Sequence, residues 1–318
     1  MIILNKDLRL SKVLQILVLA IILILISLNI SQFSLLLLLI PINFALIGTV
    51  SSLTNSIISL VITFLVLIYF ANPTQAMDIF INSVVPGTII GIIAKKVIKQ
   101  KDSNKYQPIF TGSIVFIISM IIYYFISKYV FKIDLLNTFL QLVGQSLESQ
   151  KSLILNGSNK ILNSQDILDN MRNLMPSILF FRGITLSIII YLIEIFILRK
   201  MKYDGLSEIR FKNFYLPGNA ILASLVLYLL IMGISYMKTP LYTDAIFLNL
   251  QIVFDFMFVI QGIAVSIYFI RKWLEQRTNK KLFIGALCIG IFGMTCISFI
   301  GMIDSILDFR KIREYKSM

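Results

Sequence analysis

Long apolar stretches recur along this chain, and they constrain its fold more than any other feature of the sequence. A helix needs roughly 20 mostly apolar residues to cross the hydrocarbon layer of a bilayer. Inside that layer each backbone N–H and C=O must find a protein partner, which a helix supplies within its own segment. The recurring stretches therefore predict an all-α fold, a polytopic bundle of transmembrane helices.

The stretches predict about nine spans, within a range of eight to ten, by the length that a crossing requires. Their expected bounds are Val13–Asn29, Phe33–Val50, Ser56–Phe70, Ile79–Ile98, Phe110–Val130, Pro176–Leu198, Asn219–Tyr236, Ala245–Ile270 and Leu282–Ile303. Pro41 and Pro86 fall inside two of these segments, where neighbouring helices can satisfy the backbone groups that a proline frees. We expect a single integral membrane domain over residues 1–318.

The composition agrees with this class of protein. Hydrophobic residues make up 58% of the 318 residues and charged residues 14%, whereas soluble domains carry about 25% charged residues. The net charge of +13 does not point to nucleic acid, because basic residues concentrate in the cytoplasmic loops of membrane proteins. The chain has no histidine, and its two cysteines, Cys288 and Cys296, lack metal-ligand spacing. We expect no metal and no cofactor.

The basic residues also predict an orientation. Most of them fall in four segments, at residues 6–12, 95–105, 199–212 and 271–281. All four lie on one side if the N-terminus is cytoplasmic, which predicts a multi-pass protein of the cell membrane. The C-terminal tail disagrees, because a ninth span puts Arg310, Lys311, Arg313 and Lys316 outside. Either the tail is basic and external, or the count changes through a re-entrant last segment or a merged first pair.

The segment 131–175, between the fifth and sixth spans, is the one long stretch that we expect outside the membrane. Leu135, Leu136, Phe139, Leu140, Val143 and Leu147 recur in it at helical spacing. This pattern predicts an external amphipathic helix, followed by a shorter one that contains Ile167 and Leu168.

A few polar residues fall inside the predicted spans, where charges are costly and often mark function. Arg182 and Asp255 lie about 9 and 15 Å from the outer ends of their helices. They pair as a structural ion pair, or they line an outward-facing ligand site together with Gln261. Gln261 can equally bond between helices. We expect Glu194 to reach the interface beside Arg199 and Lys200.

Small residues at four-residue spacing allow close packing of helices. Gly87 and Gly91 have this spacing in the fourth span, and Ala286 and Gly290 have it in the ninth. We expect these four residues to pack helices together within the bundle, with oligomerisation as the alternative.

Four sequence motifs carry a family resemblance. They are Pro41-Ile42, the run from Pro86 to Gly91, Gln261-Gly262-Ile263-Ala264 with Tyr268-Phe269, and Gly301-Met302-Ile303-Asp304 with Asp308-Phe309-Arg310. In their order and spacing the chain resembles the YybS-like bacterial multi-pass membrane proteins, whose function is unknown. That family is similar to the substrate-binding S components of energy-coupling-factor transporters, which implies a six-helix part over 1–198 and three additional helices over 199–318. The first span lacks the alanine spacing by which S components meet their transport partner.

The sequence contains no nucleotide-binding, metalloprotease or serine-hydrolase motif, and we do not expect an enzyme or catalytic residues. The first hypothesis is binding or transport of a small solute within the bilayer. The second is a non-transporting protein that assembles another membrane protein in the cell envelope.

Overall fold

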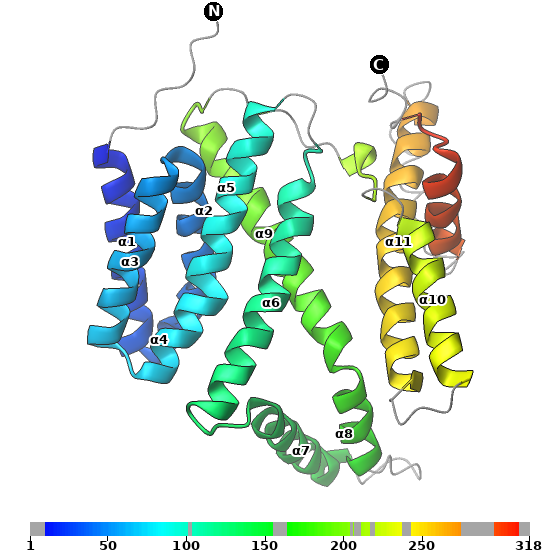
Figure 1. The fold of residues 1–318 in the computed structure, drawn as a ribbon, viewed down its shortest axis with the longest axis horizontal. Coiled ribbons are helices and arrows are strands. Elements are labelled where there is room, and N and C mark those ends of the chain that lie inside the picture. The colour runs from blue at the N-terminus through cyan, green and yellow to red at the C-terminus, as the bar shows by residue number, and fades with distance from the viewer. Residues whose placement is uncertain are drawn as a thin grey trace, which may run out of the picture. The chain divides into compact units, whose positions relative to one another are not determined.

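The computed structural model describes residues 10–100, 104–154, 164–203, 206, 211–216, 220–236, 243–274 and 296–311. The described residues form helices and turns and contain no strand, which confirms the predicted class, a polytopic helical bundle (Figure 1). The chain divides into two compact units. Unit 1 comprises Met1–Arg172 and Ile178–Ser207, and unit 2 comprises Asn173–Ser177 and Glu208–Met318.

The helices of unit 1, of which α8 and α9 extend into Asn173–Ser177 of unit 2, follow the predicted order of spans. They are α1 (Leu10–Asn29), a 3₁₀-helix η1 (Ser31–Leu39), α2 (Ile40–Val50), α3 (Leu53–Phe70), α4 (Pro73–Ile79), a π-helical turn η2 (Phe80–Val84), α5 (Val85–Lys99), α6 (Gln107–Tyr129), α7 (Leu135–Ile154), α8 (Ser164–Asn173) and α9 (Met175–Lys200). Unit 2 contains η3 (Phe211–Asn213), α10 (Ala220–Tyr236), α11 (Thr243–Leu274) and a C-terminal helix, Cys296–Leu307.

Six helices in the described part of the chain are long and apolar enough to cross a membrane, compared with the nine predicted. The six are Ser11–Asn29, Leu53–Phe70, Pro73–Lys99, Gln107–Tyr129, Met175–Lys200 and Asp244–Ile270. Helix α10 has 17 residues, which is at the lower limit for a span. The C-terminal helix is shorter still, and the predicted residues 282–295 of the ninth span lie outside the described residues.

The second predicted span is not one α-helix. Residues Ser31–Leu39 form a 3₁₀-helix, and α2 begins only at Ile40. Pro41 has no N–H to donate, and the Ile40 N–H bonds three residues back, to Leu37. A 3₁₀-helix rises about 2.0 Å per residue and an α-helix about 1.5 Å, so the two together extend about 34 Å and still match a bilayer of about 30 Å.

The fourth predicted span begins earlier than expected and has a defect in its middle. Helix α4 starts at Pro73 rather than Ile79, and it continues through η2 into α5 as one element, Pro73–Lys99. The N–H of Val85 bonds to the carbonyl of Phe80, five residues back. Pro86 follows directly, and its ring cannot fit against the carbonyl four residues earlier. The wider turn at η2 relieves this clash.

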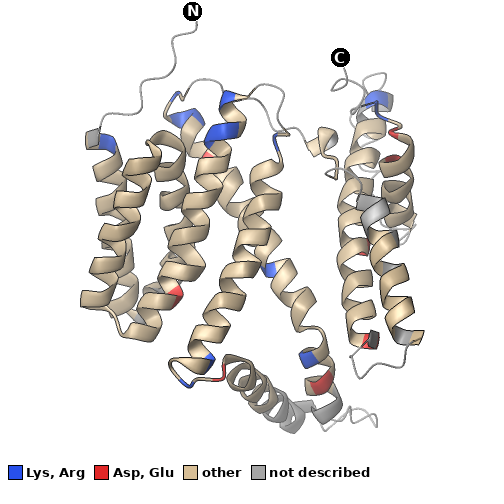
Figure 2. Ribbon diagram, in the orientation of Figure 1, with Lys and Arg blue, Asp and Glu red and all other residues tan. Residues whose placement is uncertain are grey.

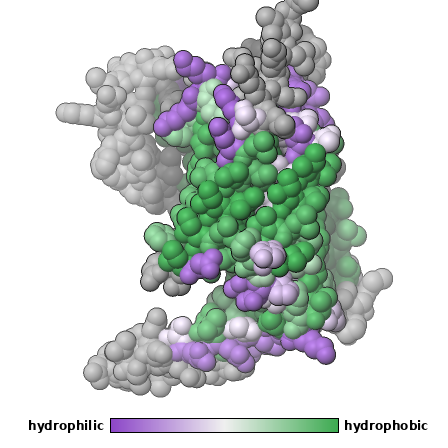
Figure 3. All heavy atoms as spheres, turned by 90° about the vertical axis from the view of Figure 1, so that its left-hand side faces the viewer, coloured by the Kyte–Doolittle hydropathy of each residue, from purple (hydrophilic) through white to green (hydrophobic). Residues whose placement is uncertain are grey.

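The surface of unit 1 has the pattern of a membrane protein. Exposed apolar side chains cover the outer faces of α1 and α3, among them Leu14, Val18, Leu19, Ile22, Leu53, Ile57, Val61 and Leu65. Figure 3 shows this apolar surface as a band between two hydrophilic margins. Lysines and arginines gather at one end of the helices, at the end of α5, the start of α6 and the end of α9 (Figure 2). These are the ends that the basic loops predict for one side.

The segment between α6 and α9 forms the two helices that its pattern predicts. Helix α7 has Leu140 buried on one face and Leu142 exposed on another. Helix α8 packs against it, because a side chain at Gly144 would lie 3.5 Å from Leu168.

Candidate functional site

Helices α2 and α5 approach each other until their backbones touch. All eleven residues of α2 are buried. A Cβ atom at Gly87 would overlap the carbonyl of Pro41, and one at Gly91 would overlap the carbonyl of Ala45. Only glycine permits this approach, so Gly87 and Gly91 set the distance between the two helices.

A buried polar cluster lies where this helix pair meets α9. We call it the Glu194 cluster, and it consists of Thr49, Gly91, Glu194 and Tyr203. The Thr49 hydroxyl lies 2.9 Å from the carbonyl oxygen of Gly91 and also makes a hydrogen bond with Glu194 Oε1. Thr49 and Glu194 are both fully buried. Glu194 Oε2 has no hydrogen-bond partner in the described structure.

Two further contacts close the cluster toward the basic end of unit 1. The Tyr203 hydroxyl donates to the backbone carbonyl of Thr49 at 3.5 Å. The Lys95 ammonium donates to the carbonyl of Ser51, just beyond the end of α2. Glu194 lies six residues before Lys200, or about 9 Å along the helix, so the carboxyl is inside the bundle rather than at its surface.

The prediction for Glu194 was therefore wrong. We expected its carboxylate to reach the interface beside Arg199 and Lys200, but the side chain has no exposed area and contacts Thr49. The sequence gives the distance from Glu194 to the helix end but not the direction of its side chain. Its direction depends on how α9 is rotated against α2 and α5. Thr49 carried no signal of its own, because a threonine near a helix end is common.

A second polar position lies in the π-helical turn of unit 1. Asn82 is about 14 Å along the span from Pro73, which is close to the middle of a bilayer. Its Nδ2 donates to Asp78 Oδ1 at 2.7 Å, while its Oδ1 is buried and has no hydrogen-bond partner in the described structure. The turn contacts both α2 and α6.

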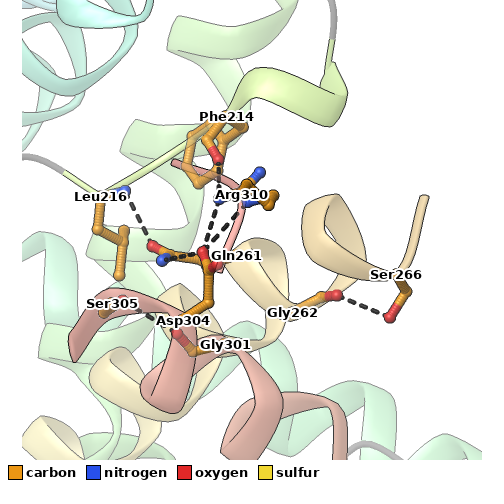
Figure 4. Close-up of polar contacts among 9 residues, drawn as sticks. All are labelled: Phe214, Leu216, Gln261, Gly262, Ser266, Gly301, Asp304, Ser305 and Arg310. Carbon is orange, nitrogen blue, oxygen red and sulfur yellow. Dashed lines mark hydrogen bonds and ion pairs between the residues drawn. The ribbon is translucent and has the colours of Figure 1, made fainter. Parts of the chain in front are cut away.

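Unit 2 contains a buried ion pair, which we call the Asp304 cluster (Figure 4). Arg310 donates to Asp304 Oδ2 from Nη2 at 2.8 Å and from Nε at 3.2 Å. The side-chain amide nitrogen of Gln261, Nε2, donates to the same oxygen at 3.0 Å. The amide oxygen, Oε1, accepts from the Leu216 N–H at 2.9 Å. Arg310 Nη2 also donates to the backbone carbonyl of Phe214 at 2.7 Å.

The chain reverses after the C-terminal helix to build this cluster. Asp308 has a φ of 43°, a left-handed conformation that ends helices and that aspartate tolerates. The turn returns Arg310 to Asp304, one helical turn and a half earlier in the sequence. Arg310 is one of the four basic residues that the sequence places in the C-terminal tail, and its side chain is buried and paired.

The same contacts show which part of the chain lies beside the end of the C-terminal helix. Phe214 and Leu216 belong to the segment that precedes α10, and Arg310 and Gln261 bind them. The end of the C-terminal helix therefore lies beside the start of α10. Residues 275–295, which join α11 to this helix, lie outside the described residues, so the alternatives for the tail stay predictions.

Of the three residues that the sequence predicts for a ligand site, two are exposed and one is buried. Arg182 is an exposed residue of α9 in unit 1, and Asp255 is an exposed residue of α11 in unit 2, so their pairing stays a prediction. Gln261 is 1% exposed and bonds between α11 and the C-terminal helix. Ala286 and Gly290 lie outside the described residues.

Sequence reasoning did not identify a second buried amide, Asn249. Its Oδ1 accepts from the Ser177 N–H at 2.9 Å, and its Nδ2 donates to the carbonyl of Asn173 at 2.6 Å. Among the described residues no group of three or more cysteine, aspartate and glutamate side chains could hold a metal ion.

Comparison with known proteins gives one match. The model of a family described as "Predicted membrane protein (DUF2232)" matches residues 18–305. No curated protein and no solved structure matches the chain.

Proposed function

The chain belongs to this family of predicted membrane proteins, and we propose that it is not an enzyme but binds a small solute inside the bilayer and carries it across. Transporters place their solute sites near the bilayer midplane, where spanning helices are interrupted and backbone or side-chain polar groups become available. Unit 1 has two such interruptions, η1 before α2 and η2 between α4 and α5.

The observation that carries the proposal is the amide of Asn82. A buried polar atom without a partner costs roughly 1–3 kcal/mol, and within a bilayer water does not supply the missing bond. Asn82 Oδ1 is such an atom, at membrane depth and in an irregular turn. A solute with an N–H or O–H donor would satisfy it, while the neighbouring Asp78 carboxylate orients the amide.

Two predictions from the sequence point the same way. The resemblance of residues 1–198 to S components implies a pocket on the outer side, and Asn82 lies in the half of the span Pro73–Lys99 that is away from the basic Lys96 and Lys99. The double variant Arg182→Ala, Asp255→Ala tests the prediction from the sequence that these two charges bind the solute, and it should then lose the ligand-induced Tm shift.

The test is a thermal-stability screen of the full-length protein in lipid nanodiscs against a panel of vitamins and metabolites. A ligand at 100 times its Kd stabilises the folded protein by about 2.7 kcal/mol. We expect at least one compound to raise the Tm of the wild type, and Asn82→Leu to abolish the shift. Asn29→Leu is the matched control, because Asn29 is exposed at the end of α1. Absence of any stabilising compound, or an equal shift in Asn82→Leu, would refute the proposal.

The alternative function is assembly of another membrane protein at the basic end of unit 1. The lysines at the end of α5 favour it, since basic residues near the surface also attract anionic headgroups with about 1 kcal/mol each. Replacing Lys96 and Lys99 by glutamine would then remove a crosslinked partner and leave every ligand-induced Tm shift unchanged.

A further inference from the structure

The hydrogen bonds of Thr49 specify where a proton resides. A threonine hydroxyl has one hydrogen to donate, and it can also accept. Thr49 Oγ1 contacts two oxygens, the carbonyl of Gly91 at 2.9 Å and Oε1 of Glu194. The Gly91 carbonyl can only accept. If Glu194 is ionised it can only accept as well, and the single hydrogen of Thr49 could then serve both oxygens only as a shared, three-centre bond.

Protonation of Glu194 removes this conflict. The acid Oε1–H then donates to Thr49 Oγ1, and the Thr49 hydroxyl donates to the carbonyl of Gly91. All three atoms in the row are satisfied, and no charge remains on a side chain that is fully buried. Burial acts in the same direction, since an isolated carboxylate in a low-dielectric interior is far more costly than a neutral acid.

The charged and titratable groups around Glu194 all have other partners in the structure. On α9 itself, Tyr191 donates its hydroxyl hydrogen to the carbonyl of Lys105 at 3.0 Å. On α5, Lys95 donates to the carbonyl of Ser51, and beyond α9 the Tyr203 hydroxyl donates to the carbonyl of Thr49. Helix α2 contains no titratable side chain.

We propose that Glu194 is a proton-binding site, which holds one proton while α2, α5 and α9 are packed as in this structure and releases it when they separate. In the release step the Glu194 O–H bond breaks, the proton passes to water, and the carboxylate keeps the electron pair. Gly91 packs directly against the backbone of Ala45 beside the cluster, so opening of the α2–α5 contact is the event that would expose the proton. The site is separate from Asn82, and its test needs no solute.

The test is infrared spectroscopy of the full-length protein in lipid nanodiscs. A protonated carboxyl has a carbonyl stretching band that an ionised carboxylate lacks, and the band shifts when the proton is exchanged for deuterium. We expect the band in the wild type at neutral pH and its loss in Glu194→Gln. We also expect it to weaken in Gly91→Ala, in which the new Cβ would overlap the carbonyl of Ala45 and force α2 and α5 apart.

Three further variants separate proton binding from a merely structural acid. Thr49→Val keeps the acid but removes its hydrogen-bond acceptor, so the band should move to higher frequency. Lys95→Met should leave the band in place, since Lys95 binds the Ser51 carbonyl. Asp304→Asn is the matched control, because Arg310 pairs with that carboxylate and it should contribute no acid band.

The proposal is overturned by any of three results. The wild type shows no acid band at neutral pH, the band persists in Glu194→Gln, or the band is as strong in Gly91→Ala as in the wild type. Stabilisation by sodium ions in the wild type but not in Glu194→Gln would also overturn it, since the site would then hold a metal cation rather than a proton.

Discussion

Within the residues that the structure describes, each unit contains one buried carboxyl group, and the two are stabilised in different ways. Asp304 in unit 2 is 2% exposed and receives three hydrogen bonds on one oxygen, two of them from the cationic Arg310. Glu194 in unit 1 is fully buried, and its contact is the neutral hydroxyl of Thr49. Removing one partner of a buried ion pair leaves an uncompensated charge and destabilises the fold. A buried carboxyl without a paired cation is instead a candidate for proton exchange.

The largest expected effect is at the ion pair of unit 2. Arg310→Met leaves Asp304 as a buried, uncompensated carboxylate, which should destabilise the protein by about 3–5 kcal/mol. The double variant Arg310→Met, Asp304→Leu should recover most of that loss, because no charge remains buried. Unfolding in detergent micelles measures both. If the double variant is no more stable than Arg310→Met, the pair does not stabilise unit 2 in the way that we describe.

The next effect concerns the helix contact that encloses Glu194. In Gly91→Ala the new Cβ would overlap the carbonyl of Ala45, so α2 and α5 must separate, at about 1–3 kcal/mol for overpacking. Gly233→Ala is the control, because a Cβ there meets nothing within 4 Å. Equal Tm values for the two variants would show that α2 and α5 are not in backbone contact.

A smaller effect is expected at the amide that supports the ion pair. Gln261→Leu removes the bonds to Leu216 and Asp304, at roughly 1 kcal/mol, the scale of polar bonds between membrane helices. The same substitution at Gln251, an exposed residue of α11, should change the stability much less. A loss of several kcal/mol in Gln261→Leu would instead mean that the amide is essential to the fold of unit 2.

The smallest stability effect should be at Glu194, and it tests the comparison most directly. If Glu194 is already neutral, Glu194→Gln preserves its shape and charge and should cost less than about 1 kcal/mol, the scale of one hydrogen bond. Asp304→Asn should cost distinctly more, because Arg310 then remains buried without a counter-charge. Similar losses in the two variants would remove the distinction between the two carboxyl groups.

Local features of the sequence were sufficient for the fold class. The apolar runs predict about nine spans, and six of these match described helices that are long and apolar enough to cross a membrane. The spacing of apolar residues also predicts the helices α7 and α8 between the fifth and sixth spans. The prolines mark where the helices are irregular, although the pattern did not say that Pro41 would follow a 3₁₀-helix or that Pro86 would follow a π-helical turn. Those outcomes depend on which neighbouring elements satisfy the backbone.

The candidate sites were less accessible to sequence reasoning. Arg182 and Asp255 were selected because a charge inside an apolar run stands out, yet both side chains are exposed in the structure. Glu194 lies about as far from a helix end as many residues that reach the membrane interface. The residues next to it in the sequence do not indicate that it faces Thr49, 145 positions earlier.

The sequence by itself determined that the chain is a helical membrane protein, because apolar length and charge placement are local properties. It also contained the four motifs that characterise the chain. Only the tertiary structure joined them in pairs, Pro41 with Gly87 in unit 1, and Gln261 with Asp304 and Arg310 in unit 2. The physical reason is that a buried polar group is satisfied by whatever lies across the helix interface, and that partner is set by helix rotation and packing distance rather than by neighbours in the chain.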